Sequence, residues 1–191
     1  MSPKEEFLSL LKSVQREGMD TLAEFLETKT DFFSAPASTK FHGNFEGGLV
    51  EHCLKVYKNY ISLLELKGVE YDKESAIICA LLHDVCKANN YVKESRNRKV
   101  DNKWESYEVW NNVKAPQIPL PHSARSIKII KSFIPLKFRE ELTIYYHMGP
   151  YGDDNYEYRN LISQVNTKYP ETLLFYTADL ITSYLDEKIV E

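Results

Sequence analysis

Cysteine is scarce in this chain, whose 191 residues contain only Cys53, Cys79 and Cys86. The count is odd and there is no Cys-x-x-Cys pair, which argues against a disulfide framework and indicates reduced thiols. The first residues, Met1–Glu6, lack the apolar run of a secretory signal. These absences together predict a cytoplasmic protein.

Long apolar runs and an excess of basic residues are also missing. The longest apolar stretch, Ala76–Leu82, is far shorter than the ~18 residues of a membrane span, so we expect no membrane partner. The net charge is −4, whereas a general nucleic-acid binder usually has a basic footprint. Nucleic acid is therefore possible but not favoured as a ligand. A small phosphorylated molecule in a locally positive, metal-loaded pocket is compatible with this charge.

What the chain does contain is helical periodicity in a length that suits one domain. Ser2-Pro3-Lys4-Glu5 has the pattern of a capping box at the start of a helix. Asp72 is suited to cap a helix over 73–87, whose centre is apolar on every side and is therefore expected to be buried. The expected helices cover 3–28 in two pieces, 49–66 (closed by Gly68), 73–87, 123–133, 136–147, 155–165 and the region from Pro170 onward.

One segment departs from the helical pattern. Residues 91–95 and 104–110 resemble two short strands, and residues 100–103 would turn between them. We therefore predict a small β-hairpin insertion at about 91–110 on an otherwise all-α body. Its rings (Tyr91, Trp104, Tyr107 and Trp110) could stack on a base, although packing of the hairpin onto the helices is the favoured interpretation.

The strongest chemical signal is the pair His83-Asp84 on the buried helix. An unpaired buried carboxylate costs several kcal/mol, so Asp84 must be hydrogen-bonded, ion-paired or bound to a metal. Adjacent helical residues project about 100° apart, so both side chains can converge on one ion beside the helix. Lys87 lies on the same side, where it could reach a phosphate. The alternative is that His83 caps the helix and Asp84 pairs with Lys87.

At this point the chain resembles the HD superfamily of metal-dependent phosphohydrolases, which is defined by a helical His, an adjacent His-Asp pair and a distant Asp. Three stretches carry the resemblance, namely Gly47-Gly48-Leu49-Val50-Glu51-His52, His83-Asp84-Val85-Cys86-Lys87 and Ala178-Asp179-Leu180. The resemblance implies a single HD domain over 1–191, with an all-α helical bundle and a metal-site core at about 34–186. It also implies metal ligation by His52, His83, Asp84 and Asp179.

The last of these ligands, Asp179, lies on the final expected helix. Leu173, Thr177, Leu180, Ile181 and Tyr184 are expected to form the core-facing stripe, with Asp179 on another face. A lone helical Asp is usually solvated. The order of the motifs favours a metal ligand instead.

Two further histidines lie at helix ends, His122 at an entry and His147 at an exit. HD subgroups with two metals use extra histidines at similar places, so the resemblance implies a second metal site in which Asp84 bridges the ions. The alternative is that both histidines orient groups or donate to phosphate beside a single metal. Mn, Fe, Co, Ni, Zn and Mg all suit such ligands, and the sequence does not choose among them.

Two other residues are candidates for the pocket. His42 lies in the loop before the first ligand and could line the pocket, although a residue that merely belongs to the loop is the commoner case. Arg125 lies one turn beyond His122, and a guanidinium matches phosphate oxygens in pairs. Its alternative is a surface ion pair.

The resemblance thus implies hydrolysis of a phosphoester, with Lys87 and Arg125 stabilising the charge of the transition state. The expected substrate is a nucleotide or cyclic nucleotide. The alternatives are a 3′–5′ exonuclease acting on single-stranded RNA or DNA, and a non-catalytic nucleotide sensor. Cyclic-dinucleotide hydrolysis is disfavoured, because Met148-Gly149-Pro150 follows His147 where that subgroup has Gly-Tyr-Pro.

Overall fold

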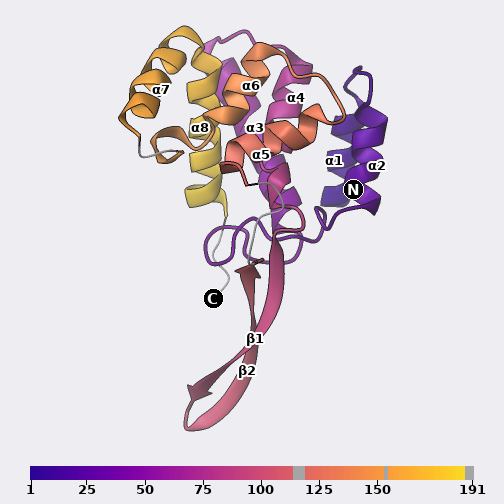
Figure 1. Cartoon of the computed structure of the whole chain (residues 1–191), viewed down its shortest axis with the longest axis vertical. Helices are drawn as coiled ribbons and strands as arrows, with labels where there is room; N and C mark the ends of the chain where they lie inside the picture. The colour runs from indigo at the N-terminus through magenta and orange to yellow at the C-terminus, as the bar shows by residue number, and fades with distance from the viewer. Residues whose placement is uncertain (114–118, 153–154, 188–191) are drawn as a thin grey trace.

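The computed structural model describes residues 1–113, 119–152 and 155–187 (Figure 1). Over these residues the chain is mainly α-helical with one two-stranded antiparallel hairpin, as predicted. The helices are α1 (Pro3–Lys12), α2 (Met19–Thr28), α3 (Gly48–Lys67), α4 (Lys73–Leu82), α5 (His122–Lys131), α6 (Phe138–Tyr145), α7 (Tyr156–Lys168) and α8 (Pro170–Ile181). Short 3₁₀ turns cover Val85–Lys87 and Gly149–Tyr151, and a π-helical turn covers Thr182–Asp186.

The N-terminal helices begin and dock as their side chains dictate. The predicted capping box at α1 is confirmed, because Ser2 Oγ accepts from the Glu5 amide while the Glu5 carboxylate accepts from the Ser2 amide. Beyond α1, Arg16 makes a bidentate ion pair with Glu140 of α6, at 2.8 and 2.9 Å. Glu140 is completely buried, so this pair ties the segment between α1 and α2 to α6.

Helix α4 is the central helix, as its apolar sequence predicts. Every residue from Ser75 to Leu82 is buried, and Asp72 caps the helix by accepting from the Ser75 amide. The predicted end at residue 87 is wrong, because the helix stops at Leu82 and a 3₁₀ turn follows. The Ala80 carbonyl, which would accept from the Asp84 amide in a continuing helix, instead accepts from the His83 ring.

Helix α8 packs against α3 through a different face from the expected one. The buried residues of this region include Glu171, Thr172, Leu174, Phe175, Ala178 and Thr182. Leu173 is 43% exposed and Tyr184 is 79% exposed, so the predicted core stripe is wrong. Asp179 adjoins the buried face, and its side chain is 16% exposed. The π-helical turn after Ile181 changes the periodicity that the stripe assumed.

The double glycine before α3 is required by the turn that feeds the helix. Gly47 has a φ of 81°, a conformation that suits glycine. A Cβ on Gly48 would lie 2.0 Å from the Gly43 carbonyl oxygen. That same carbonyl accepts from the Ala37 amide at 2.8 Å, so the loop closes on itself beside the first turn of α3.

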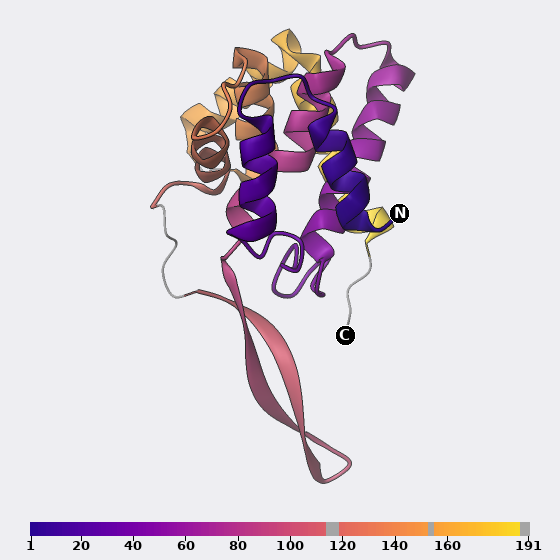
Figure 2. The same cartoon turned by 90° about the vertical axis from the view of Figure 1, so that its right-hand side faces the viewer.

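The hairpin is longer than predicted and forms an arm (residues 91–112) that projects from the helical body (Figures 1 and 2). Strands β1 (Tyr91–Val100) and β2 (Lys103–Asn112) pair in register from Tyr91 opposite Asn112 to Val100 opposite Lys103. The predicted turn is confirmed, with positive φ at both Asp101 and Asn102, as in a tight hairpin turn. The favoured interpretation of the rings is wrong for the outer arm, because Trp104 is 73% exposed.

Among the residues that the structure describes, no helix combines the length and apolar character needed to cross a bilayer.

Candidate metal centre

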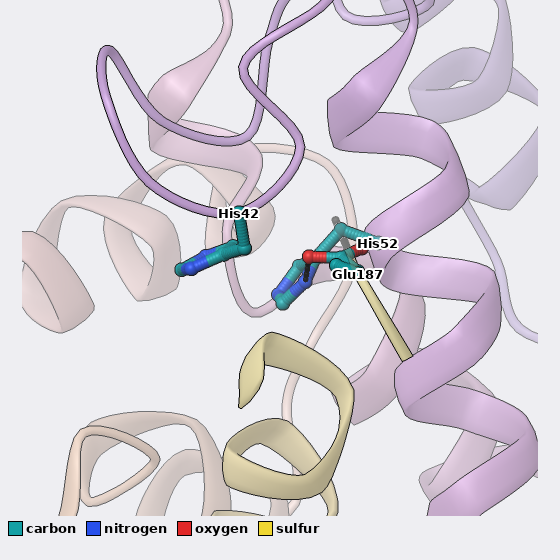
Figure 3. A group of neighbouring side chains, drawn as sticks. All are labelled: His42, His52 and Glu187. Carbon is teal, nitrogen blue, oxygen red and sulfur yellow. Dashed lines mark hydrogen bonds and ion pairs between the residues drawn. The ribbon is translucent and has the colours of Figure 1, made fainter. Parts of the chain in front are cut away.

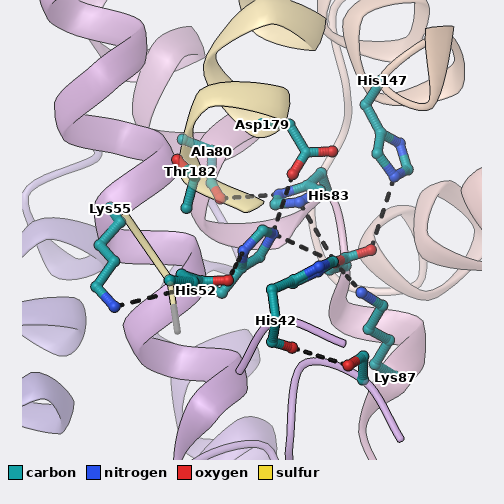
Figure 4. A network of polar contacts seen from close by, with 12 residues as sticks. His42, His52, Lys55, Ala80, His83, Lys87, His147, Asp179 and Thr182 are labelled. Carbon is teal, nitrogen blue, oxygen red and sulfur yellow. Dashed lines mark hydrogen bonds and ion pairs between the residues drawn. The ribbon is translucent and has the colours of Figure 1, made fainter. Parts of the chain in front are cut away.

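The structure brings all six predicted metal ligands together at one end of the helical body. His52 comes from α3, His83 and Asp84 follow α4, His122 begins α5, His147 follows α6, and Asp179 lies near the end of α8. Their nitrogen and oxygen atoms fall into overlapping groups within 4.8 Å of one another, namely His52–His83–Asp84, His83–His147–Asp179 and Asp84–His122–His147. Figure 4 shows four of these side chains, His52, His83, His147 and Asp179, converging from segments far apart in sequence.

Asp84 lies at the centre, and its two oxygens face different histidines. Oδ2 lies 3.4 Å from His83 Nε2 and 3.7 Å from His52 Nε2. Oδ1 lies 2.5 Å from His122 Nε2 and 3.7 Å from His147 Nε2. The carboxylate therefore stands between two pairs of imidazoles, one pair at each oxygen.

Each of the four rings turns Nε2 toward Asp84 because Nδ1 has a partner on the outer side. His83 Nδ1 donates to the Ala80 carbonyl at 3.0 Å, and His147 Nδ1 donates to the Ile144 carbonyl at 2.7 Å. His52 Nδ1 is 3.2 Å from the Glu187 carboxylate. His122 Nδ1 lies 3.1 Å from the Cys86 sulfur.

This arrangement fits a divalent cation. A backbone carbonyl on Nδ1 fixes the tautomer whose Nε2 carries a free lone pair, which is the usual environment of a metal-bound histidine. Nε2 of His83 and Nε2 of His147 are buried and have no hydrogen-bond partner. Buried polar atoms without partners are costly, and a cation would satisfy both.

Three histidines of the cluster have pKa values far from the ordinary value of a histidine. Burial disfavours the charged His52 ring, but hydrogen bonds to Asp179 and Glu187 outweigh burial and raise its pKa to about 9. His122 has its pKa raised to about 9, because the Asp84 charge outweighs the effect of burial. Burial lowers the pKa of His147 to about 3, and the charge of His83 lowers it further.

Lys87 and Arg125, the two residues predicted to contact phosphate, have different surroundings. Lys87 contacts the centre directly, with Nζ 2.6 Å from Asp84 Oδ2. The pKa of Asp84 is held well below its usual range, because this ammonium and the neighbouring imidazoles outweigh burial. Arg125 makes no ion pair within the described part of the chain, and its buried Nε has no hydrogen-bond partner. The alternative of a surface ion pair is therefore wrong for Arg125.

Three further residues lie beside the centre. His42 was a candidate to line the pocket, whereas Glu187 and Cys86 were not predicted to contact it. His42, whose commoner role is that of a loop residue, stacks on His52 with ring centroids 5.1 Å apart (Figure 3). Glu187 is buried against the same ring and follows the π-helical turn, so no helical periodicity links it to Asp179. Cys86 contacts the His122 ring, and its position two residues after Asp84 was the one available signal.

The comparisons with known proteins give one partial relative. Over 90 residues the chain is 36% identical to a dihydroneopterin 2′,3′-cyclic phosphate phosphodiesterase of Methanocaldococcus jannaschii. The match covers 45% of this chain and 34% of that relative, so the chain spans about a third of the relative's length. No family model matches, and no solved structure matches. The relative's name supports phosphoester hydrolysis, and the His/Asp cluster fits the resemblance noted in the sequence.

Proposed function

We propose that the chain is a metal-dependent phosphohydrolase of the HD superfamily, folded as one domain, that cleaves a phosphoester bond of a nucleotide or cyclic nucleotide. The observation that carries the proposal is the set of four imidazoles whose Nε2 atoms face one buried carboxylate while their Nδ1 atoms have outer partners. The partial relative, which acts on a cyclic phosphate, supports the same class of bond.

His52, His83, Asp84 and Asp179 would hold one cation, and His122 and His147 would hold a second that shares Asp84. Support comes from the two Asp84 oxygens, each of which faces its own pair of histidines. When bound, divalent cations polarise a phosphoryl oxygen and activate water as a nucleophile at neutral pH. If two ions bind, metal analysis of the wild-type chain gives about two per chain, and His122→Ala reduces this to about one.

The protein's own groups have distinct tasks in this proposal. Lys87, whose ammonium contacts Asp84 and is raised in pKa by that charge despite burial, remains cationic and neutralises a phosphate oxygen. Arg125 supplies a second cation, and its guanidinium can donate to two phosphate oxygens. Glu187, the Ala80 carbonyl and the Ile144 carbonyl keep three imidazoles oriented.

The test is a chromatographic screen of mono-, di-, tri- and cyclic nucleotides with Mn, Fe, Co, Ni, Zn and Mg. Wild-type turnover is expected to be lost in Asp84→Ala and in the isosteric Asp84→Asn, with helical circular dichroism unchanged. Asp20→Ala, which removes an exposed carboxylate of α2, is the matched control and should turn over normally. Turnover retained in both Asp84 variants would refute the proposal. Nucleotide binding without turnover under every metal would indicate a sensor instead.

A further inference from the structure

The proposed function leaves the arm without a role. Its strands stand away from the helices (Figure 2), and most of its side chains are exposed. A two-stranded hairpin is marginally stable by itself in water, and an exposed tryptophan such as Trp104 adds apolar surface that a monomer does not need. The composition of its two faces indicates what the arm contacts.

The strand register assigns each side chain to a face, because directly opposed residues of an antiparallel pair share one. One face, called here the ring face, carries Tyr91, Trp110 and Trp104 in a row from the base of the arm toward its tip. Lys93 lies opposite Trp110, and Lys99 lies opposite Trp104. The valines of the arm all lie on the other face.

The chemistry of the ring face suits a polyanion with stacking bases. Lys93 Nζ lies 5.0 Å from the centre of the Trp110 ring. The same ammonium pairs with the exposed carboxylates of Glu46 and Glu108, at 3.2 and 4.0 Å, with which a phosphate would compete. Lys99 makes no ion pair within the described ranges of the chain. The positions between the rings are mostly serine and asparagine. Rings flanked by cations and small polar groups are typical of platforms for single-stranded nucleic acid.

The row of rings also begins at the metal centre. The Asn90 amide donates to the Lys87 carbonyl at 3.1 Å, so β1 starts directly beyond the lysine that contacts Asp84. Tyr91 is half-buried there. The pKa of its hydroxyl is raised by burial, against the opposing charge of Lys87. A nucleic-acid strand lying along the ring face would therefore reach the Asp84 cluster at the base of the arm.

We propose that the ring face of the arm binds a single-stranded oligonucleotide and directs its end to the Asp84 cluster. The second half of this proposal rests on the proposed function, whereas binding by the arm does not. The acidic net charge of the whole chain is compatible with it, because stacking supplies much of the affinity and only Lys93 and Lys99 need to meet phosphates on this face.

Intrinsic fluorescence tests the arm directly, because Trp104 and Trp110 are the two tryptophans of the chain. Titration of the full-length protein with a ten-nucleotide oligo(dT) should quench their emission. The logarithm of the binding constant should fall with the logarithm of salt concentration at a slope of about −1.4 for two neutralised phosphates.

The variants separate stacking from strand structure. Trp104→Val keeps a strand-forming residue without the ring and should weaken binding at least about 5-fold. Trp104→Phe should restore most of the affinity. Glu105→Ala, on the opposite face, is the matched control and should bind like the wild type. Wild-type affinity in Trp104→Val, or no quenching at all, would overturn the proposal.

Two further results are diagnostic. A concentration-dependent blue shift without oligonucleotide, with a doubled mass in light scattering and no response to oligo(dT), would assign the arm to a second copy of the chain and overturn the proposal. Failure of the proposed function looks different: nucleotide turnover is absent, yet oligo(dT) still quenches the wild type and Trp104→Val still weakens binding. That result would retain the arm as a nucleic-acid surface.

Discussion

Binding of a divalent cation to the Asp84 cluster must displace protons, because a histidine ligand has to be neutral. In the metal-free protein His52 and His122 both have a pKa raised to about 9 by the neighbouring carboxylates. We therefore predict that the apparent affinity for Mn²⁺ keeps rising with pH well above 6.5, where an ordinary histidine is already neutral.

The size of the effect follows from the two pKa values. At pH 7 a group with a pKa of about 9 is neutral in about one molecule in a hundred, so each of the two proposed ions binds about 100-fold more weakly than at pH above 9. The overall constant for loading both ions is lowered about 10⁴-fold. Below pH 9 the affinity for each ion should rise about 10-fold per pH unit, and the overall constant for both ions about 100-fold. His147 contributes no proton, since its pKa is lowered to about 3.

The assay is calorimetric titration of metal-free protein with Mn²⁺ under argon from pH 6.5 to 8.5, in pairs of buffers that differ in ionisation enthalpy. About two protons should be released per fully loaded chain at pH 7. In His122→Asn one proton-bearing ligand is missing, so the pH slope should fall by about half. An affinity independent of pH above 7 would show that both rings are already neutral and would refute the reasoning.

Three further predictions concern one ion pair of the fold and two residues that support the cluster. Arg16→Ala should destabilise the fold by about 3–5 kcal/mol in urea unfolding, because it leaves Glu140 charged and buried without its ion pair; a loss below about 1 kcal/mol would contradict this. Gly48→Ala should lower both the melting temperature and Mn²⁺ binding, because its Cβ would lie 2.0 Å from a backbone carbonyl oxygen; wild-type values for both would contradict this. Glu187→Ala should weaken Mn²⁺ binding about 10- to 100-fold by freeing the His52 ring, while Glu187→Gln, which keeps an acceptor, should recover most of it; equal loss in both variants would point to charge instead of orientation.

Local chemistry made part of this fold predictable from the sequence. The capping box at Ser2, the Asp72 cap and the hairpin turn at Asp101-Asn102 each depend on residues a few positions apart. The buried helix α4 was equally predictable, because a helix that is apolar on every side has no face that suits solvent. For the same reason His83-Asp84 could be identified as a site that needs partners.

Other features depend on contacts that no local pattern encodes. The buried face of α8 is set by α3, and Leu173, apolar in a helical repeat, lies on the outside. Glu187 reaches His52 across 135 positions of sequence and a π-helical turn. The exposure of Trp104 follows from the length of the arm, whereas the sequence specifies only that the strands pair.

The same type of hydrogen bond, from a histidine Nδ1 to the carbonyl three residues earlier, occurs at the ends of α4 and α6 and orients two rings. His83 Nδ1 donates to the carbonyl of Ala80 and His147 Nδ1 donates to that of Ile144, each three residues back. Helix α4 ends directly before His83, and α6 ends two residues before His147. Each ring is thus aimed by its own segment, without help from the chain that follows. This independence explains how a 22-residue insertion can start a few positions after Asp84 while the cluster keeps its form. We expect that lineages could lengthen, exchange or lose the arm while inheriting the same centre.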